Sequence, residues 1–276
     1  MNLRNRHSNQ VAIGAVFSIA VLVLSAVVPA WAGSFEEGHA AYQRTDFITA
    51  LKIWKPLAEK GDARAQYNIG IIYDQGRGVP ADKKKAVQWW LKAAGQDMPE
   101  ALHNLASSYL FGSGADEEHE KAVSWMTKAA ELGLARSQYT LGQMYLYAHG
   151  VAKDDAKGRH WIERAALRGL DKAQYNMGKI SRDGIAGPAD KKSAAQWFLK
   201  AAKQGYAKAQ RHIGRRYAVG EGIEKDEAEA LFWVTLAARQ GDKTSEENRK
   251  TLIKRLSPEK IKEVMARVEG WRPARP

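Results

Sequence analysis

The chain has 276 residues, of which 45% are hydrophobic and 27% charged, and this composition is typical of a globular rather than a disordered protein. It contains no cysteine, which excludes a disulfide framework, a thiolate metal site and a cysteine nucleophile. Lysine and arginine number 43 against 31 acidic residues, a formal net charge of +12. A charge of this sign favours acidic partners such as nucleic acid, anionic polysaccharide, anionic lipid or an acidic protein surface.

Residues 1–32 have the pattern of a secretory signal peptide. Arg4 and Arg6 precede an uncharged, mostly apolar stretch, Val11–Ala32, which ends in the motif Ala30-Trp31-Ala32. We predict cleavage after Ala32 and a periplasmic or secreted product. An uncleaved inner-membrane anchor with a periplasmic domain stays the alternative, because the apolar stretch is long enough to span a bilayer of about 30 Å. Without the two arginines the charge falls to +10, and export argues against nucleic acid as a partner.

A period of 36 residues runs through most of the remaining chain. Small residues recur at Gly70, Ala106, Gly142, Gly178 and Gly214. Tryptophan recurs at Trp89, Trp125, Trp161, Trp197 and Trp233, and an acid at Asp82, Glu118, Asp154, Asp190 and Asp226. Five units in phase predict a tandem repeat over residues 63–241.

Each repeat is predicted to be a pair of helices. In the first copy, apolar residues at helical spacing run from Ala63 to about Gln75, and Gly76 then ends that helix. Asp82 is placed to cap a second helix, which carries Trp89. We predict that the glycine and tryptophan columns form the repeat core. Because so short a pair cannot bury both faces, the pairs must stack on one another.

The two ends are predicted to cap the stack. Residues 33–62 are expected to hold an opening helix pair over Gly38–Lys60, in which Trp54 is one residue out of phase with the tryptophan column. Residues 242–276 are expected to form a helix over Thr244–Leu256, a second one starting at Ser257-Pro258, and a frayed basic tail.

The segment AQYNIGIIYDQGRGVPADKKKAVQWWLKAA at Ala65–Ala94 and its four later copies resemble the Sel-1-like repeat family, which is related to tetratricopeptide repeats. The resemblance implies an all-α, right-handed superhelical solenoid of antiparallel helix pairs. It also implies an adaptor that assists assembly of complexes, envelope processes or interaction with a host. The chain departs from the pattern at Ala148, Ser181 and Ala186, so we expect the loop Asp183–Asp190 to differ in shape.

No catalytic or metal-binding motif is found in the sequence. The histidines show no H-E-x-x-H or comparable pairing, and the acidic run around His119 is typical of a solvated helix start. We therefore predict no enzyme activity and no cofactor, and an enzyme with an unrecognised site stays the most distant alternative.

The predicted binding surface is the concave groove that the first helices form in tetratricopeptide proteins. Two columns should face it, one holding Tyr67 and the other Ile71, and their character changes from aromatic and apolar to cationic along the chain. The candidate partner-binding residues are Tyr67, Tyr139, Tyr175, Lys179, Arg182, Arg211 and Arg215. Arginines hold carboxylates by two parallel hydrogen bonds, which favours a protein partner with an acidic segment. Two alternatives stay open: these columns are solvated helix faces, or they bind an anionic envelope polymer such as exopolysaccharide, lipopolysaccharide or peptidoglycan.

Overall fold

Fourteen α-helices and no strand make up residues 33–274, the part of the chain described by the structure, which is a computed structural model. The predicted signal peptide, residues 1–32, lies outside the described residues. The helices are α1 (Phe35–Gln43), α2 (Phe47–Glu59), α3 (Ala63–Gln75), α4 (Lys83–Ala94), α5 (Pro99–Leu110), α6 (His119–Glu131), α7 (Ala135–Tyr147), α8 (Asp155–Leu167), α9 (Asp171–Asp183), α10 (Lys191–Lys203), α11 (Ala207–Val219), α12 (Glu227–Arg239), α13 (Lys243–Ile253) and α14 (Pro258–Gly270).

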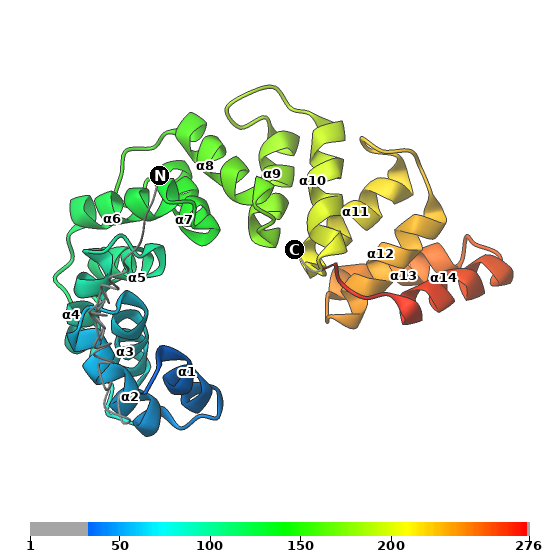
Figure 1. The fold of residues 1–276 in the computed structure, drawn as a ribbon. Helices are drawn as coiled ribbons and strands as arrows, with labels where there is room; N and C mark the ends of the chain where they lie inside the picture. Colours follow the sequence, from blue (N-terminus) through cyan, green and yellow to red (C-terminus); the bar gives the residue numbers. More distant parts are fainter. Residues whose placement is uncertain (1–32, 275–276) are drawn as a thin grey trace, which may run out of the picture. The chain divides into compact units, whose positions relative to one another are not determined.

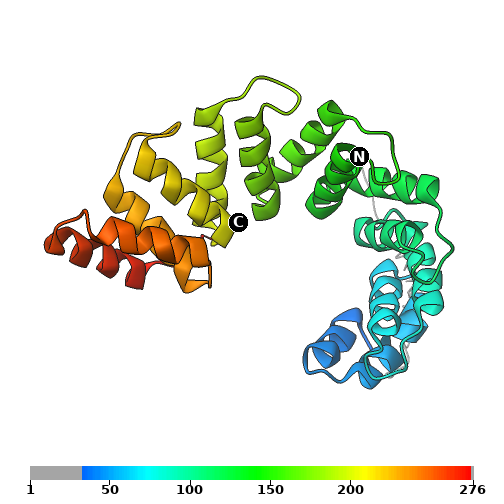
Figure 2. The same cartoon turned by 180° about the vertical axis from the view of Figure 1, so that it is seen from behind.

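These helices form a right-handed solenoid of antiparallel pairs, which confirms the predicted fold class. Each helix from α1 to α12 packs on the next one in the chain, and α14 packs back on α12. Figures 1 and 2 show the pairs following one another around an arc. In Figure 1 the first helices α3, α5 and α7 lie nearer the inside of the arc than the second helices α4 and α6.

Acidic residues start most of the second helices, as predicted. Oδ1 of Asp82 accepts a hydrogen bond from the backbone N–H of Lys85 at 2.9 Å, and Asp154, Asp190 and Asp226 cap their helices in the same way. Glu118 is the exception, since it makes no capping bond. Glutamate is a poorer N-cap than aspartate, and the Glu118 carboxylate instead binds Lys121 at 2.8 Å.

The loop of the fourth repeat keeps the geometry of the others, contrary to the sequence expectation. The backbone N–H of Asp190 donates to the carbonyl of Ser181 at 2.7 Å, as that of Asp82 donates to Tyr73 at 2.8 Å. Ala186 adopts a φ of 54°, in the left-handed region where other repeats place glycine. The loop closure therefore holds even where an alanine must take the costlier backbone conformation.

A glycine on the first helix faces a bulky side chain on the second helix in every repeat but one. Gly70, Gly142, Gly178 and Gly214 are buried at this contact. A Cβ added to Gly178 would lie 2.7 Å from Cδ1 of Phe198, and one added to Gly214 would lie 2.7 Å from Cγ1 of Val234. The helices can approach this closely only because these positions lack a side chain.

The structure places the centre of the core one residue after the predicted tryptophan column. Trp89, Trp125, Trp161 and Trp197 are half-buried at the edges of the core clusters, whereas the following residues Trp90, Met126, Ile162 and Phe198 are buried. Trp54 lies 36 residues before Trp90 and is fully buried. It is therefore in phase with the buried column of Trp90, and not with the half-buried column of Trp89. Trp233 alone of its column is buried, because α12 also packs against α13 and α14.

Buried glutamines join four of the five repeats to the preceding helix pair. Nε2 of Gln66 donates to the carbonyl of Ala58 at 2.9 Å, and its Oε1 accepts from Gln96 at 2.9 Å. Gln138, Gln174 and Gln210 repeat the bond to the preceding second helix. These bonds satisfy carbonyls at the carboxyl ends of the second helices, which an α-helix leaves without internal partners.

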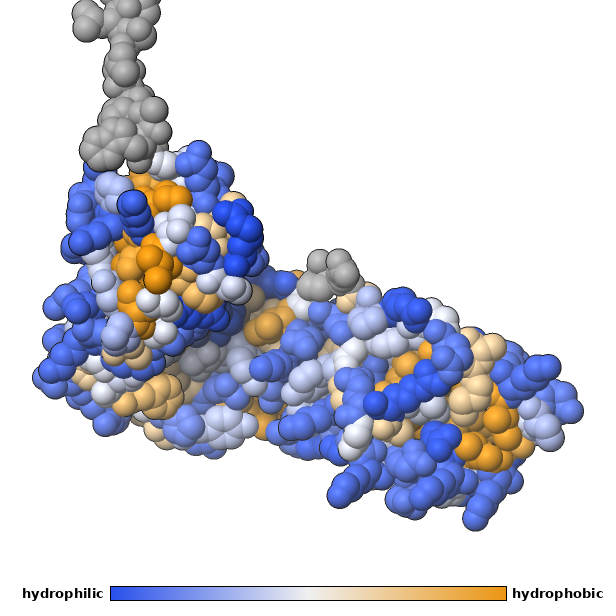
Figure 3. All heavy atoms as spheres, turned by 90° about the horizontal axis from the view of Figure 1, so that it is seen from below, coloured by the Kyte–Doolittle hydropathy of each residue, from blue (hydrophilic) through white to orange (hydrophobic). Residues whose placement is uncertain are grey.

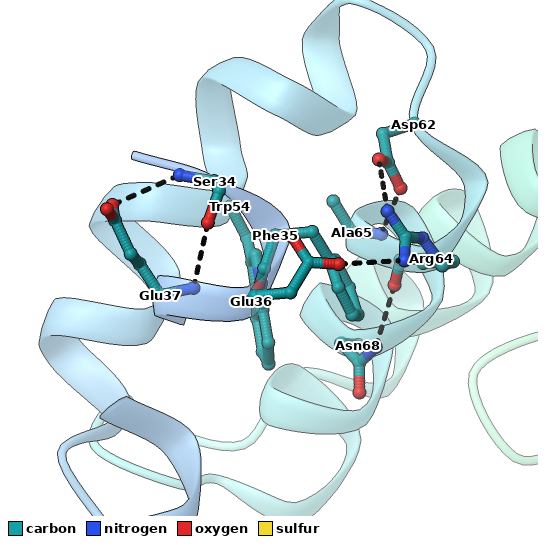
Figure 4. A network of polar contacts seen from close by, with 9 residues as sticks. All are labelled: Ser34, Phe35, Glu36, Glu37, Trp54, Asp62, Arg64, Ala65 and Asn68. Atoms are coloured by element: carbon teal, nitrogen blue, oxygen red, sulfur yellow. Dashed lines mark hydrogen bonds and ion pairs between the residues drawn. The ribbon is translucent and has the colours of Figure 1, made fainter. Parts of the chain in front are cut away.

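The N-terminal helix pair is fastened to the first repeat by polar and aromatic contacts, drawn in Figure 4. Oγ of Ser34 caps α1 by accepting from the backbone N–H of Glu37 at 3.1 Å. Nη1 of Arg64 donates to Oε1 of Glu36 at 3.2 Å, and its guanidinium lies 4.1 Å from the ring centroid of Phe35.

The described part of the C-terminal tail packs on the repeats, contrary to the prediction that it is frayed. The backbone N–H of Ala274 donates to the carbonyl of Lys203 at 2.8 Å, and the Trp271 side chain packs against the core of the last repeats. The tail therefore returns from α14 to the end of α10.

We expect Gly178→Ala to lower the free energy of unfolding by about 1–3 kcal/mol, because the new methyl group overpacks the contact with Phe198. Gly270→Ala in α14 is the matched control, since nothing lies within 4 Å of an added Cβ there. It should be neutral or stabilising by up to about 1 kcal/mol. Urea unfolding of both variants tests this, and equal effects would show that the close approach does not limit packing.

Candidate partner-binding groove

Two hollows on the first helices mark the surface, here called the inner face, that the sequence predicts to bind a partner. The N-terminal hollow lies between α3 and α5, has a volume of about 490 Å³ and includes Tyr67 in its wall. The C-terminal hollow lies between α11 and α13 and has a volume of about 240 Å³. Figure 3, which looks into the open side of the arc, shows a largely hydrophilic surface with separate apolar patches.

The two hollows occupy the same place in the repeat. Six residues that line the N-terminal hollow have equivalents, four 36-residue repeats later in the sequence, that line the C-terminal hollow. Ile71, Asp74, Gln75, Asn104, Ser107 and Phe111 correspond to Arg215, Ala218, Val219, Asn248, Thr251 and Arg255. The scaffold thus offers one binding position with different side chains at its two ends.

The three predicted tyrosines differ in how much of their surface is free. Tyr67 lines the N-terminal hollow. The hydroxyl of Tyr139 accepts a hydrogen bond from Asn176 at 2.9 Å, and burial raises the pKa of Tyr139. Tyr175 lies among the rings of Phe198, Tyr206 and His212, with centroids 5.1–5.7 Å away. Tyr139 and Tyr175 therefore contribute to packing between repeats.

Two of the predicted cations already have carboxylate partners. Arg182 donates to both carboxylate oxygens of Asp183, at 2.6 and 2.7 Å. Nη1 of Arg211 donates to Oδ2 of Asp242 at 2.8 Å. Lys179 and Arg215 have no ion pair with any residue of the described part of the chain, and Arg215 is exposed. The available positive charge is therefore smaller than the sequence suggests.

Sequence reasoning missed a set of exposed apolar residues at the carboxyl ends of three first helices, α5, α7 and α11. Phe111 is 74% exposed, Tyr147 53% and Val219 62%. Phe111 lines the N-terminal hollow, and Val219 lines the C-terminal one. The 36-residue spacing of these residues is visible in the sequence, but nothing in it shows that they remain exposed. Large exposed apolar side chains at a hollow are typical of interaction surfaces.

Arg216 is a buried cation that the sequence did not single out. It is 1% exposed and occupies a column that otherwise holds Ile72, Ser108, Met144 and Ile180. Its guanidinium lies 4.6 Å from the ring centroid of Phe198, and within the described residues its Nε and Nη2 have no hydrogen-bond partner. Burial lowers the pKa of Arg216 because it removes water from the charged form.

We expect Arg216→Met to raise the free energy of unfolding by about 1–3 kcal/mol, because it removes buried donors without partners and keeps a long apolar side chain. Ile180→Met, at the equivalent position one repeat earlier, is the control and should change stability by less than about 1.5 kcal/mol. Denaturant titration measures both. A loss of stability in Arg216→Met would mean that the contact with Phe198 outweighs the cost of burial.

Two histidines on the first helices are held neutral. Burial lowers the pKa of His103 to about 4, assisted by the charge of Arg136. Burial, followed by the charges of Arg211 and other arginines, lowers the pKa of His212 to about 4. Nδ1 of His103 lies 2.9 Å from Oγ of Ser137, and the His212 ring stacks on Phe198.

Stability should therefore fall as the pH is lowered from about 6.5 to 4. In this window the unfolded chain binds protons at these histidines and the folded chain does not, so acid favours unfolding. The double variant His103→Gln/His212→Gln should show a smaller decrease in melting temperature across the window, whatever its stability at pH 7. His39→Gln, an exposed position, serves as the control. An unchanged slope in the double variant would contradict the assignment.

The described residues hold no cluster of three or more histidine or acidic side chains that could bind a metal ion. His119 lies at the start of α6, and its Nε2 is 2.7 Å from Oε1 of Glu117. No helix within residues 33–274 is both long and apolar enough to cross a membrane.

The fold and its inner face define an all-α repeat scaffold. Residues 63–98, 99–134, 135–170, 171–206 and 207–242 each match the Sel1 repeat. These units cover more than half of the chain, which therefore belongs to the Sel1 repeat family, as the resemblance predicted. Sel1 repeat proteins are generally non-catalytic protein-interaction scaffolds.

The solved structures that are similar to this chain include two with a TM-score of 0.70. A Sel1 repeat protein from Oxalobacter formigenes is 36% identical with a TM-score of 0.70, over 74% of this chain and 59% of that one. The protein c5321, a protective antigen present in uropathogenic Escherichia coli strains with an SLR fold, is 30% identical with a TM-score of 0.70, over 80% of this chain and 48% of that one. This chain thus spans about half to three-fifths of either protein.

A shorter similarity links the chain to DAP3-binding cell death enhancer 1 of Rattus norvegicus. The two are 40% identical over 42 residues, which is 15% of this chain and 8% of that protein. The chain spans less than a tenth of the curated relatives it matches, so this similarity reaches one repeat and little more.

Proposed function

We propose that this protein is an exported, non-catalytic adaptor that binds a segment of a partner protein along its inner face. The proposal rests on the pair of equivalent hollows, which lie four repeats apart. The two hollows occupy the same position in the repeat but are lined by different side chains. A repeat scaffold keeps its core and varies its binding positions, and this division is what the two hollows exhibit.

The side chains of the inner face favour an extended segment with an acidic end. The N-terminal hollow offers the aromatic side chains Tyr67 and Phe111, whereas the C-terminal hollow offers Arg215 and Arg255. Tyr67 would contact the partner directly, and Tyr139 and Tyr175 would support it from below. Lys179 would add charge between the ends, while Arg182 and Arg211 stay bound to their own carboxylates.

Export and the domain organisation belong to the same proposal. Residues 1–32 serve as the secretory signal, so the repeats act in the periplasm or outside the cell. Residues 33–62 and 242–276 cap the ends of the five repeats. The contacts of Arg64 with α1 and the return of the tail to Lys203 support these capping roles.

Affinity capture from an envelope extract tests the proposal with one matched pair of variants. Phe111→Ser removes an exposed apolar side chain from the inner face, and Leu91→Ser removes one of 40% exposure from the second helix α4. We expect the parent and Leu91→Ser to retain the same partner protein and Phe111→Ser to lose most of it.

A partner retained equally by both variants would place the binding surface elsewhere. Capture of polysaccharide alone, released as salt is raised to about 0.5 M, would favour the anionic-polymer function, because salt screens contacts between exposed charges. Release of a protein partner held by apolar contacts should depend less on salt.

A further inference from the structure

The C-terminal hollow differs from its N-terminal equivalent in its charge. Arg215 replaces Ile71 and Arg255 replaces Phe111, while Ala218 replaces the acid Asp74. The wall of the C-terminal hollow therefore contains two cations and no carboxylate. Arg215 comes from α11 and Arg255 follows the end of α13, so the two cations come from opposite sides of the same hollow.

These two arginines are available for a ligand, unlike Arg182 and Arg211. Neither guanidinium makes a hydrogen bond to another residue within 33–274, whereas Arg182 and Arg211 are hydrogen-bonded to carboxylates. The nearest carboxylate to Arg255 is that of Glu227, at 3.7 Å, beyond normal hydrogen-bond distance. Glu227 also lies 3.2 Å from Lys225 and so shares its charge.

The floor of the hollow is apolar, which narrows the kind of anion that fits. Val234 and Leu252 are buried beneath it, and Val219 stands exposed at its edge. A free inorganic anion gains nothing from such a floor. An acidic residue next to an aliphatic one fits both the cations and the apolar surface of the hollow. The carboxylate binds the arginines, and the aliphatic group covers the side chains of Val219 and Leu252.

We propose that the C-terminal hollow is a specific subsite for an acidic residue followed or preceded by an aliphatic residue in the bound segment. Arg215 and Arg255 donate hydrogen bonds to the carboxylate, and the aliphatic side chain packs on Val219 and over Leu252. The inference rests on the proposed function and gives the segment a direction. Its acidic end lies at α11 and α13, because the C-terminal wall holds two cations and no carboxylate, whereas the N-terminal wall holds the single cation Arg136 and the carboxylate of Asp74, which is paired with Lys83.

Fluorescence polarisation with three labelled nonapeptide pools tests the subsite on the whole protein. The pools are randomised except for a central Glu-Leu, Gln-Leu or Glu-Ser pair, so that each half of the ligand is removed in turn. We expect the Glu-Leu pool to bind most tightly. Arg215→Ala and Arg255→Ala should each weaken it about tenfold or more, because each removes a hydrogen bond between charged groups.

Lys254→Ala is the matched control, since Lys254 is exposed, adjacent to Arg255 and outside the hollow. It should weaken binding by less than about twofold, as expected for general attraction at a distance. Equal losses in Arg255→Ala and Lys254→Ala would overturn the subsite, as would equal binding of the Glu-Leu and Glu-Ser pools or full competition by inorganic phosphate at matched concentration. Melting temperatures of the three variants, all at exposed positions, verify folding.

Methyl NMR locates the bound peptide independently of the arginine variants. The Glu-Leu pool should shift the methyl signals of Val219 and Leu252, and shifts confined to the N-terminal hollow would overturn the assignment. The capture experiment with Phe111→Ser does not involve this hollow. A negative result in the peptide-binding experiment would therefore not contradict the proposed function. The failure of the subsite and the failure of the proposed function can be distinguished.

Discussion

The close approach of a glycine to a bulky side chain is the contact on which the rest of the solenoid depends. Gly178 against Phe198 and Gly214 against Val234 bring the two helices of a pair to a separation that any side chain would increase. The second repeat has Ala106 instead, and there the opposing residue is the flexible Met126. Since every pair meets the next at the same faces, the spacing set within one repeat is carried along the whole arc.

Hydrogen bonds between repeats then fix how one pair stacks on another. The amide of Gln210 reaches the carbonyl of Ala202 and also accepts a bond from Gln240, so three successive helices share one buried side chain. The second repeat lacks this glutamine and holds the buried Leu102 instead. With core and stacking assigned to these columns, the inner-face positions are free to vary, and they carry the difference between the two hollows.

Electrostatic pairing decides which of the many cations can act on a ligand. Arg182, Arg211 and Arg255 each contribute one positive charge to the formal net charge, but Arg182 and Arg211 are hydrogen-bonded to aspartates within the chain. Arg216 is withdrawn from solvent altogether, at a cost that the contact with Phe198 offsets in part. The C-terminal hollow holds two cations, Arg215 and Arg255, and no carboxylate, and this pair of cations gives a bound segment a preferred direction.

The sequence by itself determined the all-α repeat, its 36-residue period and the ends of the helices in the first copy, because these follow from glycine, aspartate and apolar spacing within some forty residues. It also indicated which columns of the first helices vary. Only the tertiary structure decided which residue of the Trp89-Trp90 pair is buried. The side chains of adjacent residues on a helix point about 100° apart, and only the one that faces the neighbouring helix is buried. The same holds for the arginines. Arg211 is hydrogen-bonded to Asp242, whereas Arg255 has no hydrogen-bonded carboxylate. This difference depends on helices that stacking brings together, and spacing along the chain does not reveal such contacts.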